Sequence, residues 1–147
     1  MTKLVKFKFL AHTADRKFQA FGKTLEEVFE NSALALFNIV YGGKIKNKIK
    51  FKIHAKGRDL ENLMYNFLEE FLVLIDGNNF LPFKIINFNL DTPRKGTSKK
   101  AFKIKAEVVG DNAKNYNVSE HVKAITYNEM FIKKINGKWT SQVVLDI

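Results

Sequence analysis

The chain has 147 residues, of which 46% are hydrophobic, and it carries a formal charge of +10 and no cysteine. Its length and composition exclude a disordered chain and predict one globular domain over residues 1–147. The lack of cysteine excludes disulfides, thiolate metal sites and cysteine nucleophiles, and the absence of a leader or a long apolar run favours a cytoplasmic protein.

The first half of the chain predicts three strands and two helices. Thr24 and Glu27 form a capping box for the first helix, and Asp59 is a good N-cap for the second. The apolar residues of both helices recur every three or four positions, as in amphipathic helices. In chain order, the expected elements are strands 4–10 and 16–21, helix 25–40, strand 44–56 and helix 60–75.

The second half of the chain predicts strands only, around a polar loop at residues 91–98. Pro82 is expected at a strand start or a sheet edge, and Asn136 with Gly137 predicts a type I′ hairpin turn. We find no internal repeat. The fold class is therefore α+β, with two helices packed on one face of a mixed, largely antiparallel sheet. The expected strands are 81–90, 102–109, 122–134 and 139–145.

The charge comes from 25 Lys and Arg against 15 Asp and Glu, and it suggests an anionic partner such as RNA. However, lysines alternate with apolar residues from Lys44 to Ile53, and Lys103 and Lys105 repeat this pattern. Because a basic face attracts phosphate only non-specifically, we favour solvated strand faces over a dedicated nucleic-acid surface. We expect no DNA or membrane partner.

Catalytic motifs are missing from the sequence. It contains no P-loop, no GxGxxG and no nucleophile elbow, and His12, His54 and His121 fall at unrelated spacings. The 14 phenylalanines lie in helix stripes or on apolar strand faces, which favours a core over a base-stacking surface. We therefore expect a protein that is not an enzyme.

Three segments are more specific than packing requires: Ala11-His12-Thr13-Ala14-Asp15, then Val122-Lys123-Ala124-Ile125-Thr126-Tyr127, and Val143-Val144-Leu145-Asp146-Ile147. They resemble the archease family, in which an HTAD segment opens the chain, a KAxTYH segment lies late and an Asp-Ile pair ends it. Two further segments support the resemblance, Gly22-Lys23-Thr24-Leu25-Glu26-Glu27 and Asp59-Leu60-Glu61-Asn62-Leu63.

The resemblance implies an accessory factor of the RtcB-type RNA ligase of tRNA splicing, which promotes the guanylylation of the ligase and its multiple turnover. Contact with tRNA is expected to be indirect or weak. The resemblance also implies a divalent cation, with calcium the expected ion, held by Asp15, Asp146 and Ile147.

The chemistry of these three residues agrees with this implication. Hard cations prefer oxygen ligands, which Asp15 and Asp146 offer as carboxylates and Ile147 as main-chain and terminal oxygens. Three groups fall short of the six to eight oxygens that calcium prefers, so water or the partner must complete the shell. Without the resemblance, both aspartates would be interpreted as solvated or turn residues.

Three other residues are expected in ligase activation or partner contact. Lys123 would pair with the acidic group or touch the ligase, and His12 would orient the turn that carries Asp15. Asp59 is ambiguous, since its N-cap role explains it fully. Asn128 replaces the histidine that the family has after Thr-Tyr, and because an amide cannot titrate, we expect no proton transfer there.

Two other functions remain open at this point. The protein could be a basic RNA-binding module, supported only by its charge. It could instead be a chaperone-like protein acting on tRNA-processing enzymes, which would need a sizeable exposed apolar patch. The alternating polarity of the strands argues against such a patch. The oligomeric state, the metal bound in the cell and the ligase-contacting surface are left open.

Overall fold

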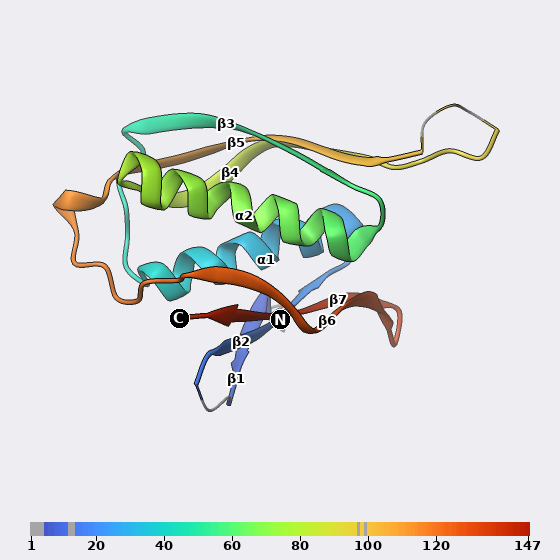
Figure 1. Cartoon of the computed structure of the whole chain (residues 1–147), viewed down its shortest axis with the longest axis horizontal. Coiled ribbons are helices and arrows are strands. Elements are labelled where there is room, and N and C mark those ends of the chain that lie inside the picture. Colours follow the sequence, from blue (N-terminus) through green and yellow to red (C-terminus); the bar gives the residue numbers. More distant parts are fainter. Residues whose placement is uncertain (1–4, 12–13, 97, 99) are drawn as a thin grey trace, which may run out of the picture.

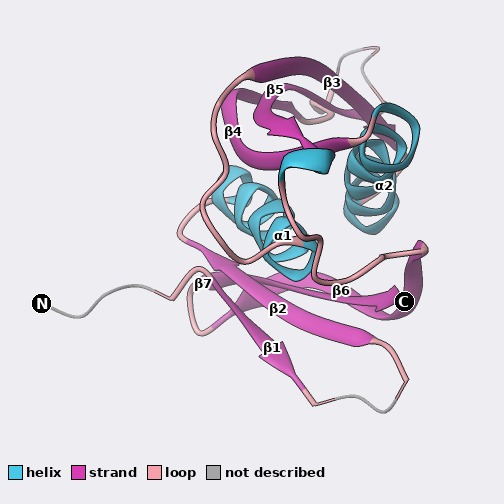
Figure 2. Ribbon diagram, turned by 90° about the vertical axis from the view of Figure 1, so that its left-hand side faces the viewer, coloured by secondary structure: helices cyan, strands magenta, loops and turns pink. Residues whose placement is uncertain are grey.

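The computed structural model describes residues 5–11, 14–96, 98 and 100–147. Two antiparallel sheets enclose a layer of two helices (Figures 1 and 2). The first sheet has the order β1 (Phe7–Leu10), β2 (Arg16–Gly22), β7 (Lys138–Asp146), β6 (Ala124–Ile135), and the second has β3 (Ile49–Gly57), β5 (Phe102–Asn112), β4 (Phe80–Asp91). The helices are α1 (Leu25–Val40) and α2 (Leu60–Asn78), and a short 3₁₀ helix, η1, covers Ala113–Asn115.

The α+β class, the two helices and the antiparallel pairing are confirmed, but the strands form two sheets instead of the one mixed sheet expected. The reason lies in the helices. On α1, buried residues such as Asn31, Ala35, Leu36 and Phe37 lie on different sides of the helix, so the buried surface spans most of the circumference instead of one stripe. A helix that is buried on more than one side must pack against another element on each side. The second sheet provides this second packing surface.

The core between the sheets is rich in aromatic rings. Phe67 of α2 contacts Phe29 of α1 and Phe88 of β4 edge to face, with ring centroids 6.0 and 5.9 Å apart. Its third edge-to-face partner is Phe71, at 5.1 Å. These contacts confirm that the helix phenylalanines belong to the core. None of the helices in the described part of the chain is long and apolar enough to cross a membrane.

The ends of several elements differ from the prediction. Helix α2 runs through Gly77 to Asn78, because Asn79 adopts the left-handed conformation (φ 48°) that ends a helix. Strand β3 begins at Ile49, since the amide of Lys46 donates to the hydroxyl of Tyr116 (2.9 Å) instead of to a strand. The hairpin turn is confirmed, with positive φ at both Asn136 and Gly137.

The two helices begin in the same way, although no repeat was predicted. Thr24 Oγ1 accepts from the Glu27 amide (3.1 Å), as Asp59 Oδ1 does from the Asn62 amide (2.7 Å). The side chains of Glu27 and Asn62 in turn accept from the amides of Lys23 and Arg58, each at 3.1 Å. The predicted capping box is therefore present, with its return bond going to the residue before the cap.

The likeness extends over ten residues, from Gly22 to Asn31 and from Gly57 to Asn66. Asn31 Nδ2 donates to the Phe21 carbonyl (2.6 Å) and Asn66 Nδ2 to the Lys56 carbonyl (2.7 Å). Each glycine ends a strand against the first turn of the following helix. A Cβ on Gly22 would lie 2.6 Å from the Val28 nitrogen, and one on Gly57 would lie 2.4 Å from the Leu63 nitrogen. Only glycine fits this approach.

We expect Gly57→Ala to lower the free energy of unfolding by about 1–3 kcal/mol, because the added methyl meets helix backbone that cannot give way. Gly77→Ala is the matched control, since a Cβ there has no heavy atom within 4 Å and the site lies in α2. That substitution should raise stability by up to about 1 kcal/mol through helix propensity. Urea unfolding of both variants measures the difference, and equal stabilities would contradict the close packing.

Asp111 fixes the end of β5. Its Oδ1 accepts from the Asn112 amide (2.8 Å) and its Oδ2 from the hydroxyl of Tyr116 (2.9 Å). These bonds, the Asn112 amide first, hold the pKa of Asp111 below its ordinary value of 3.8. The ionised side chain therefore joins β5 to Tyr116, and through that hydroxyl to the segment before β3.

Because the pKa of Asp111 is lower in the folded than in the unfolded chain, its contribution to stability is complete above pH 3.8 and is lost as the pH falls through the folded value. We expect Asp111→Asn to melt below the wild type at pH 7. The gap between the two melting temperatures should narrow below pH 3.8. Thermal melts across this range test the prediction, and a gap independent of pH would contradict it.

Candidate functional site

The pairing of β7 with its two neighbours brings the three sequence segments together at one end of the first sheet. The last β2–β7 pair is Arg16 with Leu145, and the first β6–β7 pair is Ala124 with Asp146. Continued by one residue, the β2–β7 register sets Asp15 opposite Asp146. Figure 2 shows the C-terminus at this end of the sheet, beside β6.

Both aspartates belong to the face of the sheet that points away from the helices. Phe18 of β2 and Val143 and Leu145 of β7 are buried in the core. Side chains alternate along a strand, so Asp15 and Asp146 fall on the opposite face. Directly opposite residues in an antiparallel pair have Cβ atoms about 4.5–5.5 Å apart. Asp15 is half-buried and Asp146 exposed, which leaves one carboxylate partly desolvated and the other open to solvent.

Two contacts hold the segment before β6 against this strand end. The amide of Lys123 donates to the Asp146 carbonyl (2.8 Å), and Arg16 Nε lies 2.7 Å from Glu120 Oε1. The structure thus brings Lys123 beside Asp146, with its side chain exposed. Ile147 is half-buried, and its side chain packs against the hydrophobic core, which restrains the main chain next to Asp146.

Asp59 is accounted for by its cap. Besides the bond to the Asn62 amide, its second oxygen lies 3.7 Å from Arg58 Nε. It reaches the other motif segments only indirectly, because Asn62 Nδ2 donates to the hydroxyl of Tyr127 (2.9 Å). His12 lies outside the described residues.

Tyr127 and Tyr65 form a surface feature that the sequence prediction missed. Their rings are stacked, with centroids 4.5 Å apart and planes 9° apart, and Tyr127 is 49% exposed. Burial, with Glu69 adding to it, raises the pKa of Tyr65. The sequence placed Tyr127 and Asn62, its hydrogen-bond partner, in two of the motif segments. Their spacing along the chain did not indicate that they are in contact.

A bulge in β6 follows Tyr127. The register with β7 shifts between Thr126 and Phe131, and Glu129 adopts a positive φ of 54°. Gln142 Nε2 donates to the carbonyl of Glu129 (2.8 Å), and Lys17 Nζ lies 3.2 Å from Glu129 Oε1. Bulges of this kind re-aim side chains at strand ends. Asn128 is an exposed residue of this bulge, and its backbone amide donates to Thr126 Oγ1 (3.3 Å).

The donor set suits a hard divalent cation. Asp15, Asp146 and the main-chain oxygen of Ile147 offer oxygen only, as calcium prefers. No group of three or more His, Cys, Asp or Glu side chains that could hold a metal occurs among the residues the structure describes. The site proposed from the sequence has only two carboxylate side chains, and its third ligand is a main-chain oxygen, so it would not form such a group. His54 and His121 are exposed and lie in other segments.

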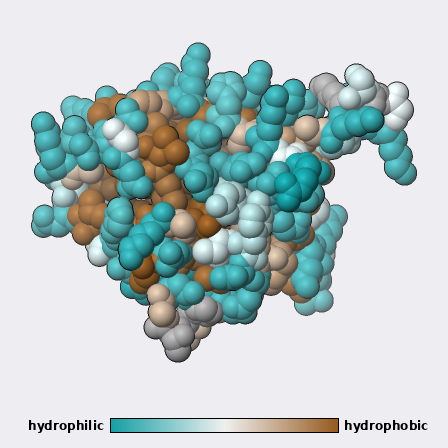
Figure 3. Space-filling model, viewed as in Figure 1, coloured by the Kyte–Doolittle hydropathy of each residue, from teal (hydrophilic) through white to brown (hydrophobic). Residues whose placement is uncertain are grey.

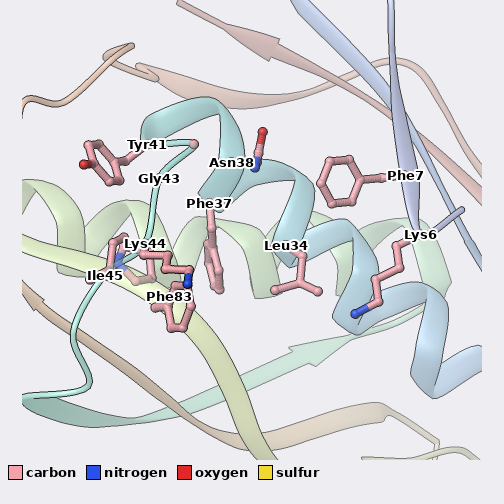
Figure 4. A pocket seen from close by; sticks show the side chains of 12 residues that line it. Lys6, Phe7, Leu34, Phe37, Asn38, Tyr41, Gly43, Lys44, Ile45 and Phe83 are labelled. Atoms are coloured by element: carbon pink, nitrogen blue, oxygen red, sulfur yellow. The ribbon is translucent and has the colours of Figure 1, made fainter.

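A hollow of about 420 Å³ lies elsewhere, between α1, β1 and the start of β4. Figure 4 shows its apolar lining, with Leu34 and Phe37 of α1 close to Phe83 of β4, and Lys6 and Lys44 at its borders. None of the residues expected at the site lines this hollow. The candidate site is therefore a surface at a sheet end, not a cavity.

Comparison with known proteins agrees with the motifs. The family model of the archease protein family (MTH1598/TM1083) matches residues 7–147. Protein archease from Methanosarcina barkeri is 39% identical over 144 residues, covering 96% of this chain and 95% of the relative. Protein archease from Pyrococcus abyssi is 39% identical over 140 residues, covering 92% and 94%.

Solved structures share the fold. The solution structure of Methanobacterium thermoautotrophicum protein 1598 superposes with a TM-score of 0.78 at 28% identity, covering 97% of this chain and 99% of the other. The crystal structure of an archease, possible chaperone, from Thermotoga maritima gives a TM-score of 0.59 at 18% identity, covering 100% and 98%, and supports the fold alone. From the family match and the curated relatives together, this chain belongs to the archease protein family.

Proposed function

We propose that this protein is a cytoplasmic accessory factor that activates an RtcB-type RNA ligase in tRNA splicing, without turnover of its own. The activation would promote guanylylation of the ligase and its multiple turnover. Family membership supports this role. The observation that carries it is the β7 register, which gathers the three motif segments at one end of the first sheet.

The strand end would act as a cation-holding contact. Asp15, Asp146 and the main-chain oxygen of Ile147 would hold the divalent cation, with calcium the expected ion. When bound, this ion neutralises two facing carboxylates and offers its remaining coordination positions to oxygen atoms of water or the ligase. Lys123, exposed beside Asp146, would contact the ligase at the border of the site.

A chaperone-like role on tRNA-processing enzymes is the second candidate, because several large apolar side chains are exposed. These come from separate elements, and Figure 3 shows brown apolar surface bordered by teal hydrophilic residues. Apolar residues exposed singly are normal on a protein surface, whereas capture of unfolded chains needs a large contiguous patch, so this candidate ranks second. The exposed residues, among those described, are Val5, Phe9, Val73, Val118, Tyr127 and Ile135.

Calcium should raise the melting temperature of the wild-type protein in a concentration-dependent way. A ligand that binds only the folded state adds about 2.7 kcal/mol at 100 times its Kd. Asp15→Asn and Asp146→Asn should lose this rise, because each removes one of the two carboxylate ligands. Differential scanning calorimetry measures both effects.

The matched control for this measurement is Asp76→Asn, which removes an exposed carboxylate from the end of α2. This variant should keep the full calcium-dependent rise. A rise that survives in both Asp15→Asn and Asp146→Asn would show that these aspartates do not bind the ion.

Substoichiometric wild-type protein should stimulate its cognate ligase, mixed with GTP and a divalent metal, in guanylylation and in multiple-turnover joining. Asp15→Ala and Asp146→Ala should each reduce the stimulation at least about tenfold, which corresponds to about 1.4 kcal/mol in the coupling between the two proteins. Asp76→Asn should stimulate as the wild type does. No stimulation by the wild type would refute the function, and unchanged stimulation by both alanine variants would refute the site.

A further inference from the structure

Lysines from two strands, separate in sequence, gather on the outer face of the second sheet. We call this surface the lysine face: Lys50, Lys52 and Lys56 of β3 with Lys103 and Lys105 of β5. All five are exposed, while the alternate residues Ile53, Ala55, Ile104 and Ala106 are buried against the helices. Teal residues line the upper border of Figure 3, where β3 and β5 lie in Figure 1.

The pairing of β3 with β5 sets like charges against each other. Lys56 is directly opposite Lys103. Like charges in directly opposite positions destabilise an antiparallel pair. Lysine on edge strands protects against sheet extension, which explains the lysines of β3. It does not explain those of β5, which is the central strand of this sheet. Asp91 of β4 is directly opposite Lys103 on its other side and offsets part of this repulsion, and a bound polyanion would relieve the rest.

The two carboxylates of this outer face are engaged within the sheet. Glu107 lies 3.2 Å from Lys50 Nζ and accepts from Asn87 Nδ2 at 2.5 Å. These contacts, that of Asn87 first, hold the pKa of Glu107 below its ordinary range. Asp91 lines a hollow of about 430 Å³ together with Asn89, Lys103 and Lys105. This hollow is lined by polar residues and offers two ammonium groups to an anion.

The basic surface continues onto a projecting arm. Residues 92–96 of the β4–β5 connection extend beyond the body of the molecule in Figure 1. Arg94, Lys95 and Lys100 on this connection are exposed. By contrast, α1 carries Glu26, Glu27 and Glu30 and no basic residue, and α2 likewise carries only acidic charges, Glu61, Glu69, Glu70 and Asp76. The helices between the sheets are therefore acidic, and the lysine face with this arm forms a basic surface on the outer side of the second sheet.

We propose that the lysine face binds RNA through the phosphate backbone. The choice of RNA among polyanions rests on the proposed function in RNA ligation. The outward positions of β3 and β5 carry no aromatic side chain, so ammonium–phosphate contacts, and not base stacking, provide the binding. The helix layer separates the lysine face from the sheet that carries Asp15 and Asp146, so RNA and ligase bind opposite sides of the protein (Figure 2).

The test replaces four lysines of the face together: Lys52→Gln, Lys56→Gln, Lys103→Gln and Lys105→Gln. The matched control removes the same charge from the first sheet: Lys8→Gln, Lys133→Gln, Lys134→Gln and Lys138→Gln. All eight positions are exposed. Fluorescence polarisation with a labelled RNA hairpin, repeated over a salt series, gives the affinity and its salt dependence, and circular dichroism checks folding. If the quadruple variant fails to fold, Lys103→Gln with Lys105→Gln replaces it.

We expect the face variant to lose at least about tenfold in affinity at low salt, and its slope of log K against log salt to fall by about 3. The control should stay within about threefold of the wild type. Equal losses in both variants would mean that net charge alone attracts RNA, which overturns the proposal. Absence of RNA binding by the wild type would overturn it as well.

The ligase assay separates this inference from the proposed function. Without RNA, ligase guanylylation should be stimulated equally by the wild type and the face variant, whereas the KM for substrate RNA should rise with the variant. If the wild type stimulates the ligase and the face variant binds RNA unchanged, the inference fails and the function stands. If the lysine face binds RNA but the wild type gives no stimulation, the function fails and RNA binding stands.

Discussion

The burial of β7 against the helices is the constraint on which the candidate site depends. Val143 and Leu145 are fully buried, and Ser141 Oγ lies 2.7 Å from Ser32 Oγ of α1 inside the core. A slip of one residue would turn these side chains to the other face and leave the hydroxyl of Ser32 without its partner. Core packing thus fixes the register of β7, and this register sets Asp146 opposite Asp15 and beside Lys123. The energy that holds Asp146 in this position therefore comes from the buried residues beside it in β7.

The layered fold also gives the protein two independent surfaces. The helices are covered by one sheet on each side, and the charged residues of both helices are all acidic. The outer face of the first sheet ends in two carboxylates, whereas the lysine face lies on the second sheet. Charges this far apart are largely screened from each other at physiological salt. Each surface can therefore attract a partner of opposite charge without weakening the other.

Local features of the fold could be predicted from the sequence, because they depend on neighbouring residues. The caps at Thr24 and Asp59 and the Asn136–Gly137 turn are examples. The division into two sheets depends on the burial of α1 on several sides, and the Lys56–Lys103 pairing depends on the register of two strands. Both result from contacts between distant parts of the chain, so the local sequence pattern could not predict them. The bulge at Glu129 could not be predicted either, because a positive φ is usually indicated by glycine and this position is a glutamate. The aspartate site came from resemblance to a family and stays a prediction, for which the register of β7 supplies only the opposite placement of Asp15 and Asp146.

The two helix starts are similar, but one position differs in a way that adds a contact. At that position the side chain helps to cap the helix in both, and only in α2 does it also bond to another strand. Glu27 and Asn62 occupy equivalent places and accept the same backbone bond, from Lys23 and Arg58. A carboxylate can only accept, whereas an amide also has two donor hydrogens. Asn62 can therefore accept from Arg58 through its oxygen and donate through its nitrogen to Tyr127. Glutamate at this position would keep the cap but, as a carboxylate, could not donate to Tyr127. The amide thus joins the start of α2 to the exposed tyrosine of β6, and in this way connects two of the motif segments that are distant in the sequence.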